Sequence, residues 1–184
     1  MAIIALEGVN GCGKSTLIKA LIEKNRDIIA LNIKDEMVED EALLTRFYER
    51  DTLGLADELV RSLLTAHVRL LERAQKLSQE GHRVILDRSI ASFYVYQYYL
   101  SDRNRLNHQL YVTLLKPLER CIHYLWLDVA LEELVARLHA RGDPIGQEEL
   151  RLRQEGYRHY FMQCDTTYTR VTSSTSEFIH GFFS

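Results

Sequence analysis

The sequence predicts an α/β protein built on a five-stranded parallel sheet flanked by helices. Short apolar runs alternate along the chain with longer segments whose apolar residues recur at helical spacing. The short runs are continuously apolar, as expected for strands that are buried on both faces of a parallel sheet. The runs that we interpret as strands are Ala2–Leu6, Ile28–Ile33, Val84–Leu86, Ile122–Leu127 and Tyr168–Thr172.

The segments with helical spacing are Lys14–Asn25, Asp40–Tyr48, Leu55–Gln79, Ala91–Tyr99, Asn104–Leu115, Leu131–Ala140 and Glu148–Phe161. The longest segment has one clearly apolar face, formed by Leu59, Leu63, Ala66, Leu70, Ala74 and Leu77. Gly81 follows and ends this helix. The chain has 184 residues, of which 46% are hydrophobic, enough for one compact core. We therefore expect a single domain that spans residues 1–184.

A glycine-rich loop joins the first strand candidate to the first helix. It reads Gly8-Val9-Asn10-Gly11-Cys12-Gly13-Lys14-Ser15 and is followed by Thr16, which matches G-x-x-x-x-G-K-[ST] in the strand–loop–helix context of a P-loop. In such loops, backbone N–H groups at the positive end of the helix bind phosphate oxygens. Lys14 would reach the β- and γ-phosphates, and the Ser15 hydroxyl would ligate Mg²⁺. We expect ATP and Mg²⁺ as cofactors, bound by Gly8, Asn10, Gly11, Cys12, Gly13, Lys14, Ser15 and Thr16.

Charged residues follow the predicted strands at one edge of the sheet. Asp87 and Arg88 come directly after Val84–Leu86, and Lys34-Asp35-Glu36 follows the second strand. Ligands of open parallel sheets bind beyond the carboxyl ends of the strands. We expect Asp87 to hold Mg²⁺ directly or through water, and Arg88 to bind a phosphate through two parallel hydrogen bonds.

Composition argues against several classes of protein. The net charge of −3 disfavours a broad surface for duplex nucleic acid. Cys12, Cys121 and Cys164 lack the spacing of a metal site or a disulfide framework, which fits a reducing cytosol. The chain starts with its first strand rather than a signal peptide, and no apolar run approaches membrane-spanning length. We expect a cytoplasmic protein with no membrane partner.

Three segments of the chain together have the pattern of a known family. Leu6–Thr16 contains the P-loop, and Asp87–Gln97 has the spacing D-R-x-x-x-S-x-x-x-Y-Q. Both segments resemble the thymidylate kinase family of P-loop kinases, the first being similar to the family's opening. Leu127–Val129, followed by a helix with Arg137 and Arg141 and then by Gly-Asp, looks like its fourth strand and the start of its lid. The resemblance implies a nucleoside or nucleotide kinase with strand order 2-3-1-4-5 and a helical lid over about residues 137–153. It covers most of the chain.

The resemblance also implies roles for individual residues. Arg88 would hold an acceptor phosphate, Tyr96 would lie against the deoxyribose, and Ser92 and Gln97 would line the acceptor pocket. Because the P-loop has no arginine of its own, the transition-state arginine would come from the lid, as Arg137 or Arg141. The remaining residues expected on the substrate side are Glu7, His67 and Phe93.

The chain departs from this family at several positions. The second strand ends in Lys34-Asp35-Glu36 instead of the family's Arg-Glu-Pro-Gly element, whose arginine helps to fix the acceptor phosphate. Asn10 replaces an aspartate of the loop, His67 lies near the place of an arginine that often contacts thymine, and Phe93 occupies a position that is often polar. These departures leave the acceptor open.

Three functions remain. The first is a deoxynucleoside monophosphate kinase, whose acceptor needs charge neutralisation but no base. The second is a hydroxyl kinase acting on a deoxynucleoside or a modified pyrimidine, free or within nucleic acid, with Asp35 or Glu36 as general base. The third is a non-catalytic nucleotide-dependent switch, which would not need a lid with arginines. The long helix Leu55–Gln79 is a candidate for pairing two copies in a homodimer.

Overall fold

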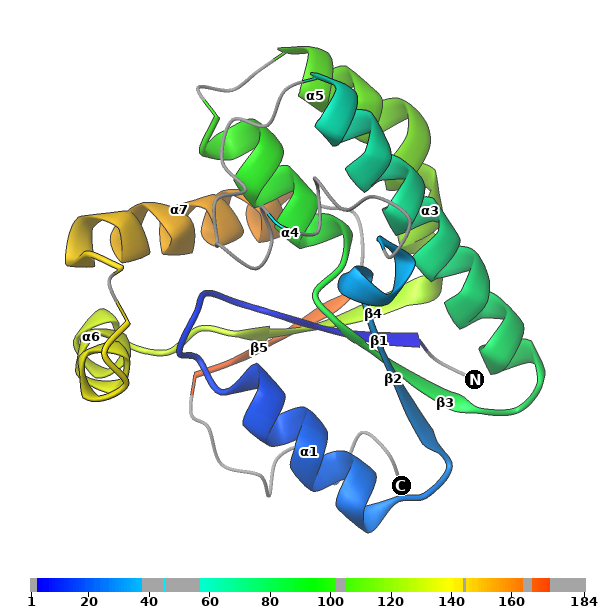
Figure 1. The fold of residues 1–184 in the computed structure, drawn as a ribbon, viewed down its shortest axis with the longest axis horizontal. Helices are drawn as coiled ribbons and strands as arrows, with labels where there is room; N and C mark the ends of the chain where they lie inside the picture. Colours follow the sequence, from blue (N-terminus) through cyan, green and yellow to red (C-terminus); the bar gives the residue numbers. More distant parts are fainter. Residues whose placement is uncertain are drawn as a thin grey trace.

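The computed structural model describes residues 3–37, 45, 57–101, 105–143, 145–163 and 167–172. Its strands form one five-stranded sheet of order β2-β3-β1-β4-β5, in which every pairing of neighbours is parallel. Helices cover both faces of this sheet (Figure 1). The predicted fold class and strand order are therefore confirmed.

The strands lie close to their predicted positions. They are β1 (Ile3–Glu7), β2 (Ile28–Asn32), β3 (Arg83–Asp87), β4 (Ile122–Leu127) and β5 (Tyr168–Val171). The α-helices are α1 (Lys14–Lys24), α3 (Asp57–Gln79), α4 (Ile90–Tyr94), α5 (Arg105–Leu110), α6 (Leu131–Ala140) and α7 (Gln147–Gln163). The helix predicted at Asp40–Tyr48 lies outside the described residues, except for Thr45.

Two predicted helices change type part of the way along. The segment read as Ala91–Tyr99 is α4 followed by a π-helix, η2 (Val95–Tyr99), and the segment read as Asn104–Leu115 is α5 followed by a second π-helix, η3 (Tyr111–Leu115). The Leu100 N–H donates to the Val95 carbonyl five residues back, at 2.9 Å. Apolar spacing does not distinguish a π-turn from an α-turn, so neither π-helix could be predicted from the sequence. Two short 3₁₀ turns, η1 (Ile33–Glu36) and η4 (Lys116–Cys121), complete the described elements.

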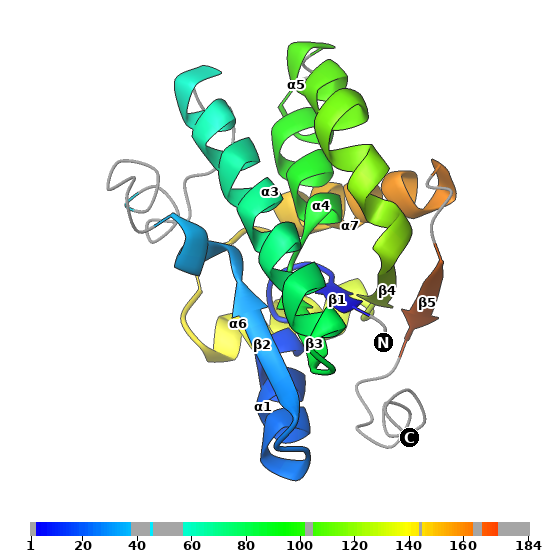
Figure 2. The ribbon, with the colours of Figure 1, turned by 90° about the vertical axis from the view of Figure 1, so that its right-hand side faces the viewer.

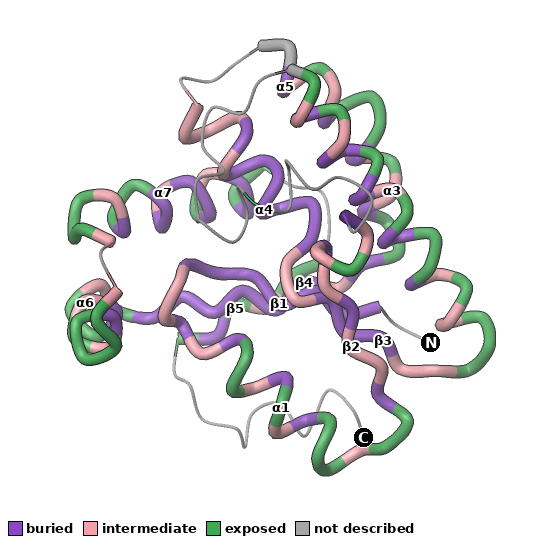
Figure 3. The backbone as a smooth tube through the Cα atoms, in the orientation of Figure 1, coloured by how far each residue is buried: buried purple, intermediate pink, exposed green. Residues whose placement is uncertain are grey.

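The inner strands β1, β3 and β4 are largely buried, as their continuously apolar sequences predicted, whereas Tyr168 and Arg170 of the edge strand β5 are exposed (Figure 3). Along β1, Ile3 and Ala5 belong to the larger apolar cluster, whereas Ile4 and Leu6 belong to a smaller one. The smaller cluster lies under α1, and α3, α4 and α7 contribute to the larger one on the opposite face (Figure 2). Truncating a buried leucine typically costs about 2–5 kcal/mol, so these two clusters dominate the stability of the fold.

The apolar face of α3 also agrees with the prediction. Leu63, Ala66, Leu70 and Ala74 are buried, and the flanking leucines of the same face pack against them. Within the described part of the chain, no helix is long and apolar enough to cross a membrane.

Candidate active site

The loop between β1 and α1 depends on its glycines. Gly8, Gly11 and Gly13 have φ angles of 139°, 85° and 100°, a region that residues with a side chain rarely adopt. A Cβ atom at Gly8 would also lie 2.6 Å from the Leu127 carbonyl oxygen. The Lys14 ammonium donates to the carbonyls of Gly8, at 2.7 Å, and Val9, at 3.1 Å. The predicted P-loop pattern therefore produces a compact loop closed over the first turn of α1.

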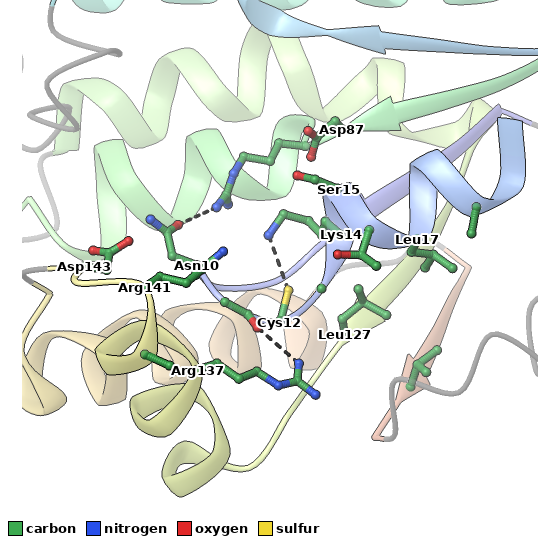
Figure 4. Close-up of a pocket in the computed structure, with 17 residues that line it drawn as sticks. Asn10, Cys12, Lys14, Ser15, Leu17, Asp87, Leu127, Arg137, Arg141 and Asp143 are labelled. Carbon is green, nitrogen blue, oxygen red and sulfur yellow. Dashed lines mark hydrogen bonds between the residues drawn. The ribbon is translucent and has the colours of Figure 1, made fainter. Parts of the chain in front are cut away.

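A cavity of about 670 Å³ opens over this loop (Figure 4). We call it the donor cavity. Its lining includes all of the residues expected to bind the nucleotide except Gly8, which lies beneath them. The lining residues of the loop and of α1 are Asn10, Gly11, Cys12, Gly13, Lys14, Ser15, Thr16, Leu17 and Ala20.

Arg137 and Arg141 close the donor cavity on the side of α6. The Arg137 guanidinium donates to the Gly11 carbonyl at 3.2 Å and pairs with Glu133, one helical turn back. Figure 4 shows Arg137 extending from α6 to the loop. Both arginines predicted to reach the transferred phosphoryl group thus line the cavity where it would lie, although their roles stay predictions.

A second cavity, of about 390 Å³, lies on the other side of Arg88, and we call it the acceptor cavity. It collects seven of the residues expected on the substrate or metal side: His67, Asp87, Arg88, Ser92, Phe93, Tyr96 and Gln97. Residues that the sequence analysis did not place there also line it: Asn32, Ile33, Leu63 and Arg153. Lys34 adds a third cation to the lining, beside Arg88 and Arg153.

The two cavities share a wall made of Asn10, Asp87 and Arg88. Arg88 donates to the Asn10 side-chain oxygen at 2.7 Å. The Asp87 carboxylate accepts a hydrogen bond from the Asn32 amide at 3.2 Å. A group bound in either cavity would therefore lie against the same three side chains.

Arg88 has an unusual backbone conformation, and its side chain donates hydrogen bonds to several residues of the site. Its φ angle of 72° is the only positive value for a non-glycine residue in the described chain, which is a strained conformation. The guanidinium donates to the Gly8 carbonyl at 3.1 Å, to the Ser92 hydroxyl at 3.3 Å and to the Tyr157 hydroxyl at 2.8 Å. The surroundings thus fix both the backbone and the side chain of this residue.

Glu7, which the sequence analysis placed on the substrate side, lies beneath Arg88, has no exposed surface and lines neither cavity. Its carboxylate accepts from the Ser89 N–H at 2.6 Å, the Ser92 hydroxyl at 2.7 Å and the Tyr157 hydroxyl at 3.2 Å. Burial raises the pKa of the Glu7 carboxyl above its usual value, although the nearby Arg88 charge opposes this. Burial alone would lower the pKa of Arg88, but Tyr96, Tyr157 and Glu7 raise it on balance, so the guanidinium stays charged.

His67 forms part of the apolar end of the acceptor cavity. Its Nδ1 lies 2.9 Å from the Leu63 carbonyl, so this nitrogen carries a proton that it donates. Burial lowers the pKa of the imidazole to about 4, and His67 is therefore neutral at pH 7. Its ring meets Phe93 edge-on at 5.7 Å between centroids. A neutral, apolar surface of this kind suits the flat face of a nucleobase.

Tyr96 lies between the two arginines of the acceptor cavity. The Arg88 guanidinium is 5.6 Å and the Arg153 guanidinium 5.2 Å from the centre of its ring, within the range of cation–π attraction. Arg153 is buried and pairs with Glu149 on the preceding turn of α7. Tyr96 lines the acceptor cavity, and the contact to deoxyribose that the resemblance implied for it stays a prediction.

The two predicted base candidates lie elsewhere. The Asp35 carboxylate accepts from the Asn32 N–H at 3.2 Å and faces a third cavity, beside Ser15 and Asp87. Glu36 pairs with Arg73 of α3 at 3.1 Å. Neither lines the acceptor cavity, because the chain turns into η1 directly after β2. Asp128, at the same edge of the sheet, is paired with Arg170 at 2.6 Å.

The residues predicted to hold Mg²⁺ fit that ion chemically. Ser15 and Asp87 both line the donor cavity, and they offer the oxygen ligands that Mg²⁺ prefers. The described residues contain no cluster of three or more acidic, histidine or cysteine side chains placed to bind a metal. Mg²⁺ is commonly bound by one or two protein oxygens together with substrate phosphates and water, so this pair is sufficient.

Sequence reasoning missed three polar contributors to the site, besides the apolar lining residues Ile33 and Leu63. Asn32 ends β2, and nothing in its surroundings in the sequence marks it. Arg153 stands in a run of arginines on α7, which is usually a solvated face. Tyr157 follows it by one helical turn and is fully buried. The spacing of Arg153 and Tyr157, four residues apart, was the one available signal that they share a helix face.

Comparisons with known proteins agree with this architecture. The family model described as deoxynucleoside kinase matches residues 4–179. No curated protein matches the chain.

Several solved structures are similar along almost the whole chain. Deoxyadenosine kinase from M. mycoides with bound dATP is 20% identical, with 98% of each chain covered and a TM-score of 0.62. Thymidylate kinase from Candida albicans is 18% identical, with coverage of 99% of this chain and 88% of that one, and a TM-score of 0.63. The YorR protein from Bacillus subtilis, in complex with phosphorylated GDP, is 17% identical, with coverage of 99% and 93% and a TM-score of 0.60. At such identities, these likenesses bear on the fold alone.

Proposed function

Since this chain belongs to the deoxynucleoside kinase family, and is thus a P-loop nucleoside or nucleotide kinase, we propose that it transfers the γ-phosphoryl group of ATP to the 5′-hydroxyl of a deoxynucleoside. The observation that carries this proposal is the shared wall. Donor and acceptor cavities meet at Asn10, Asp87 and Arg88, where a nucleophile from one side would face a phosphoryl group from the other.

The donor cavity supplies the charge that phosphoryl transfer needs. Lys14 would exchange its loop carbonyls for phosphate oxygens, and Arg137 or Arg141 would stabilise the transferring group as the segment 137–153 closes over the nucleotide. Ser15 and Asp87 would hold Mg²⁺, which when bound neutralises charge on the phosphates. Each of these residues lines the cavity.

Asp87 favours a hydroxyl acceptor over the monophosphate that the sequence put first. It is the sole carboxylate among the described residues that line the acceptor cavity, and it would repel a phosphate there wherever Mg²⁺ does not neutralise its charge. A carboxylate within reach of a hydroxyl can instead accept its proton. In this step the hydroxyl oxygen bonds to the γ-phosphorus, its proton moves to Asp87, and the bond to the β-phosphate oxygen breaks to release ADP.

The charges around the acceptor cavity support the same acceptor. Arg153 already pairs with Glu149, and Arg88 is linked to the buried Glu7 through Ser92 and Tyr157. With each guanidinium balanced by a carboxylate, the cavity suits a neutral nucleoside. Tyr96 would lie against the sugar, where it leaves little room for a 2′-hydroxyl.

A monophosphate acceptor remains the second candidate, on one specific observation. Lys34, Arg88 and Arg153 line the same cavity, and three cations around one cavity could bind a phosphate despite their partners. In that case Asp87 would serve only the metal.

A transfer assay separates the two candidates. The protein is incubated with Mg²⁺ and γ-labelled ATP against a panel of deoxynucleosides, ribonucleosides, deoxynucleoside monophosphates and an oligonucleotide with a 5-hydroxymethylated pyrimidine. We expect label in a deoxynucleoside monophosphate. Label in a diphosphate would establish the second candidate instead, and label in the oligonucleotide would establish a polymer-borne acceptor.

A further inference from the structure

We infer that Tyr157 of α7 is a positioning residue that holds the Arg88 guanidinium at the wall between the two cavities. The inference rests on the proposed function only in taking that wall as the place of phosphoryl transfer. It applies equally to a nucleoside and to a monophosphate acceptor.

The Tyr157 hydroxyl is the centre of a buried network. It accepts from the Arg88 guanidinium at 2.8 Å, lies 2.9 Å from the Ser92 hydroxyl, and donates to Glu7 at 3.2 Å. Tyr157 has no exposed surface, and it lines neither cavity. Its hydroxyl is therefore placed to act on Arg88 and not on a substrate.

Arg88 needs such support because its backbone is strained. With a φ angle of 72°, it would gain by relaxing to an ordinary conformation unless its neighbours hold it. The Arg88 N–H donates to the Leu6 carbonyl at 3.1 Å and fixes the backbone on one side. The Arg88 side chain also bonds to the P-loop and to Ser92 of α4, which follows β3 directly. Its hydrogen bond to Tyr157 is the one that ties it to the distant helix α7.

Gly156 explains how α7 brings Tyr157 so close. A Cβ atom at this position would lie 2.9 Å from the Val95 side chain and 3.0 Å from the Tyr99 ring. The absence of a side chain thus lets α7 pack directly on η2. Arg153 and Tyr157, four residues apart on α7, then lie on the same side of the helix, toward the acceptor cavity. A displacement of α7 would therefore move Arg88 through its hydrogen bond to the Tyr157 hydroxyl.

The test begins with Tyr157→Phe, which removes only the hydroxyl oxygen. We expect kcat to fall by about 10–100-fold, as small misplacements of a reacting group do, while the KM for ATP changes less than about twofold. The matched control is Tyr160→Phe, three residues further along the same helix. Its hydroxyl is also buried but bonds to Glu119 and Tyr124, away from both cavities. This control should lose thermal stability without losing kcat.

A double-mutant cycle distinguishes positioning from a merely structural role. If Tyr157 acts through Arg88, Tyr157→Phe should have almost no further effect on kcat in an Arg88→Ala background. The cycle is measured on whichever acceptor turns over fastest. An unchanged effect of Tyr157→Phe in that background would overturn the inference, as would equal losses of kcat in Tyr157→Phe and Tyr160→Phe.

A readout without any acceptor keeps this test separate from that of the proposed function. In protein labelled with ¹⁵N-arginine, the Nε–H signal of Arg88 is identified by its loss in Arg88→Ala. We expect that signal to shift and to exchange faster with water in Tyr157→Phe but not in Tyr160→Phe. An unchanged signal would refute the inference even if the chain phosphorylates deoxynucleosides. If Tyr157→Phe does not fold, Ser92→Ala, which removes the other hydroxyl joining Arg88 to Glu7, is held to this acceptor-free expectation alone, because Ser92 also lines the acceptor cavity.

Discussion

Replacement of Asp87 by asparagine tests the mechanism at its centre. The substitution keeps the shape of the side chain, and its amide oxygen can still accept the 3.2 Å hydrogen bond from Asn32, so the fold should survive. It removes the negative charge and the proton acceptor from the wall between the cavities. A positioned general base contributes about 10²–10⁴-fold to rate, and we expect kcat for a deoxynucleoside to fall within that range.

The assay must separate the loss of a base from the loss of a metal ligand. Initial rates of Asp87→Asn and of the parent protein are measured over a wide range of Mg²⁺ concentration. If Asp87 accepts the proton, saturating Mg²⁺ should not restore kcat. Recovery to within about threefold of the parent at high Mg²⁺ would refute the base assignment and leave Asp87 as a metal ligand.

Asp35→Asn is the matched control for Asp87→Asn. Asp35 lies at the same edge of the sheet but faces a different cavity, where it caps η1. We expect its turnover to stay within about threefold of the parent, because it does not reach the acceptor. A fall in kcat of about 10²-fold or more in Asp35→Asn would instead make Asp35 the general base, one of the two candidates named in the sequence analysis.

Further predictions concern the donor cavity and His67. Lys14→Ala should lower kcat by about 10²–10³-fold, the usual loss for one preorganised donor, with the far-ultraviolet circular dichroism unchanged. The double replacement of Arg137 and Arg141 by alanine should lower kcat by about 10³-fold with little change in ATP affinity measured by calorimetry. The stability of the protein should fall as pH drops from about 6.5 to about 4, because His67 takes up a proton in the unfolded chain before it does so in the folded one. Urea unfolding at pH 7 and pH 5 measures this change, and His67→Gln should reduce it.

Each of these expectations can fail clearly. A Lys14→Ala variant within threefold of the parent would remove the P-loop from the mechanism. Normal turnover without Arg137 and Arg141 would move the transition-state arginine to another residue. Identical pH dependence in the parent and in His67→Gln would mean that burial does not hold His67 neutral.

The sequence predicted those features that depend on local pattern. Continuous apolar strands implied burial on both faces, and the P-loop spacing located Lys14 and Ser15 beside the donor cavity. Contacts between segments that are distant in the sequence could not be predicted. Arg88 and Tyr157 are 69 residues apart, and no periodicity connects them. The predicted bases Asp35 and Glu36 failed to reach the acceptor cavity because the direction in which a chain leaves a strand depends on backbone geometry, which charge alone does not reveal.

The common wall of Asn10, Asp87 and Arg88 has a thermodynamic consequence. Any nucleotide that shifts the Arg88 guanidinium must change the affinity of the acceptor, since one side chain contributes to both binding surfaces. By linkage, the acceptor must then change the affinity of the nucleotide by the same factor. The two substrates would therefore not bind as independent ligands. Each substrate strengthens the binding of the other if Arg88 makes its best contacts when both are present, and weakens it otherwise. The sign of this cooperativity therefore depends on how firmly the Arg88 side chain is held.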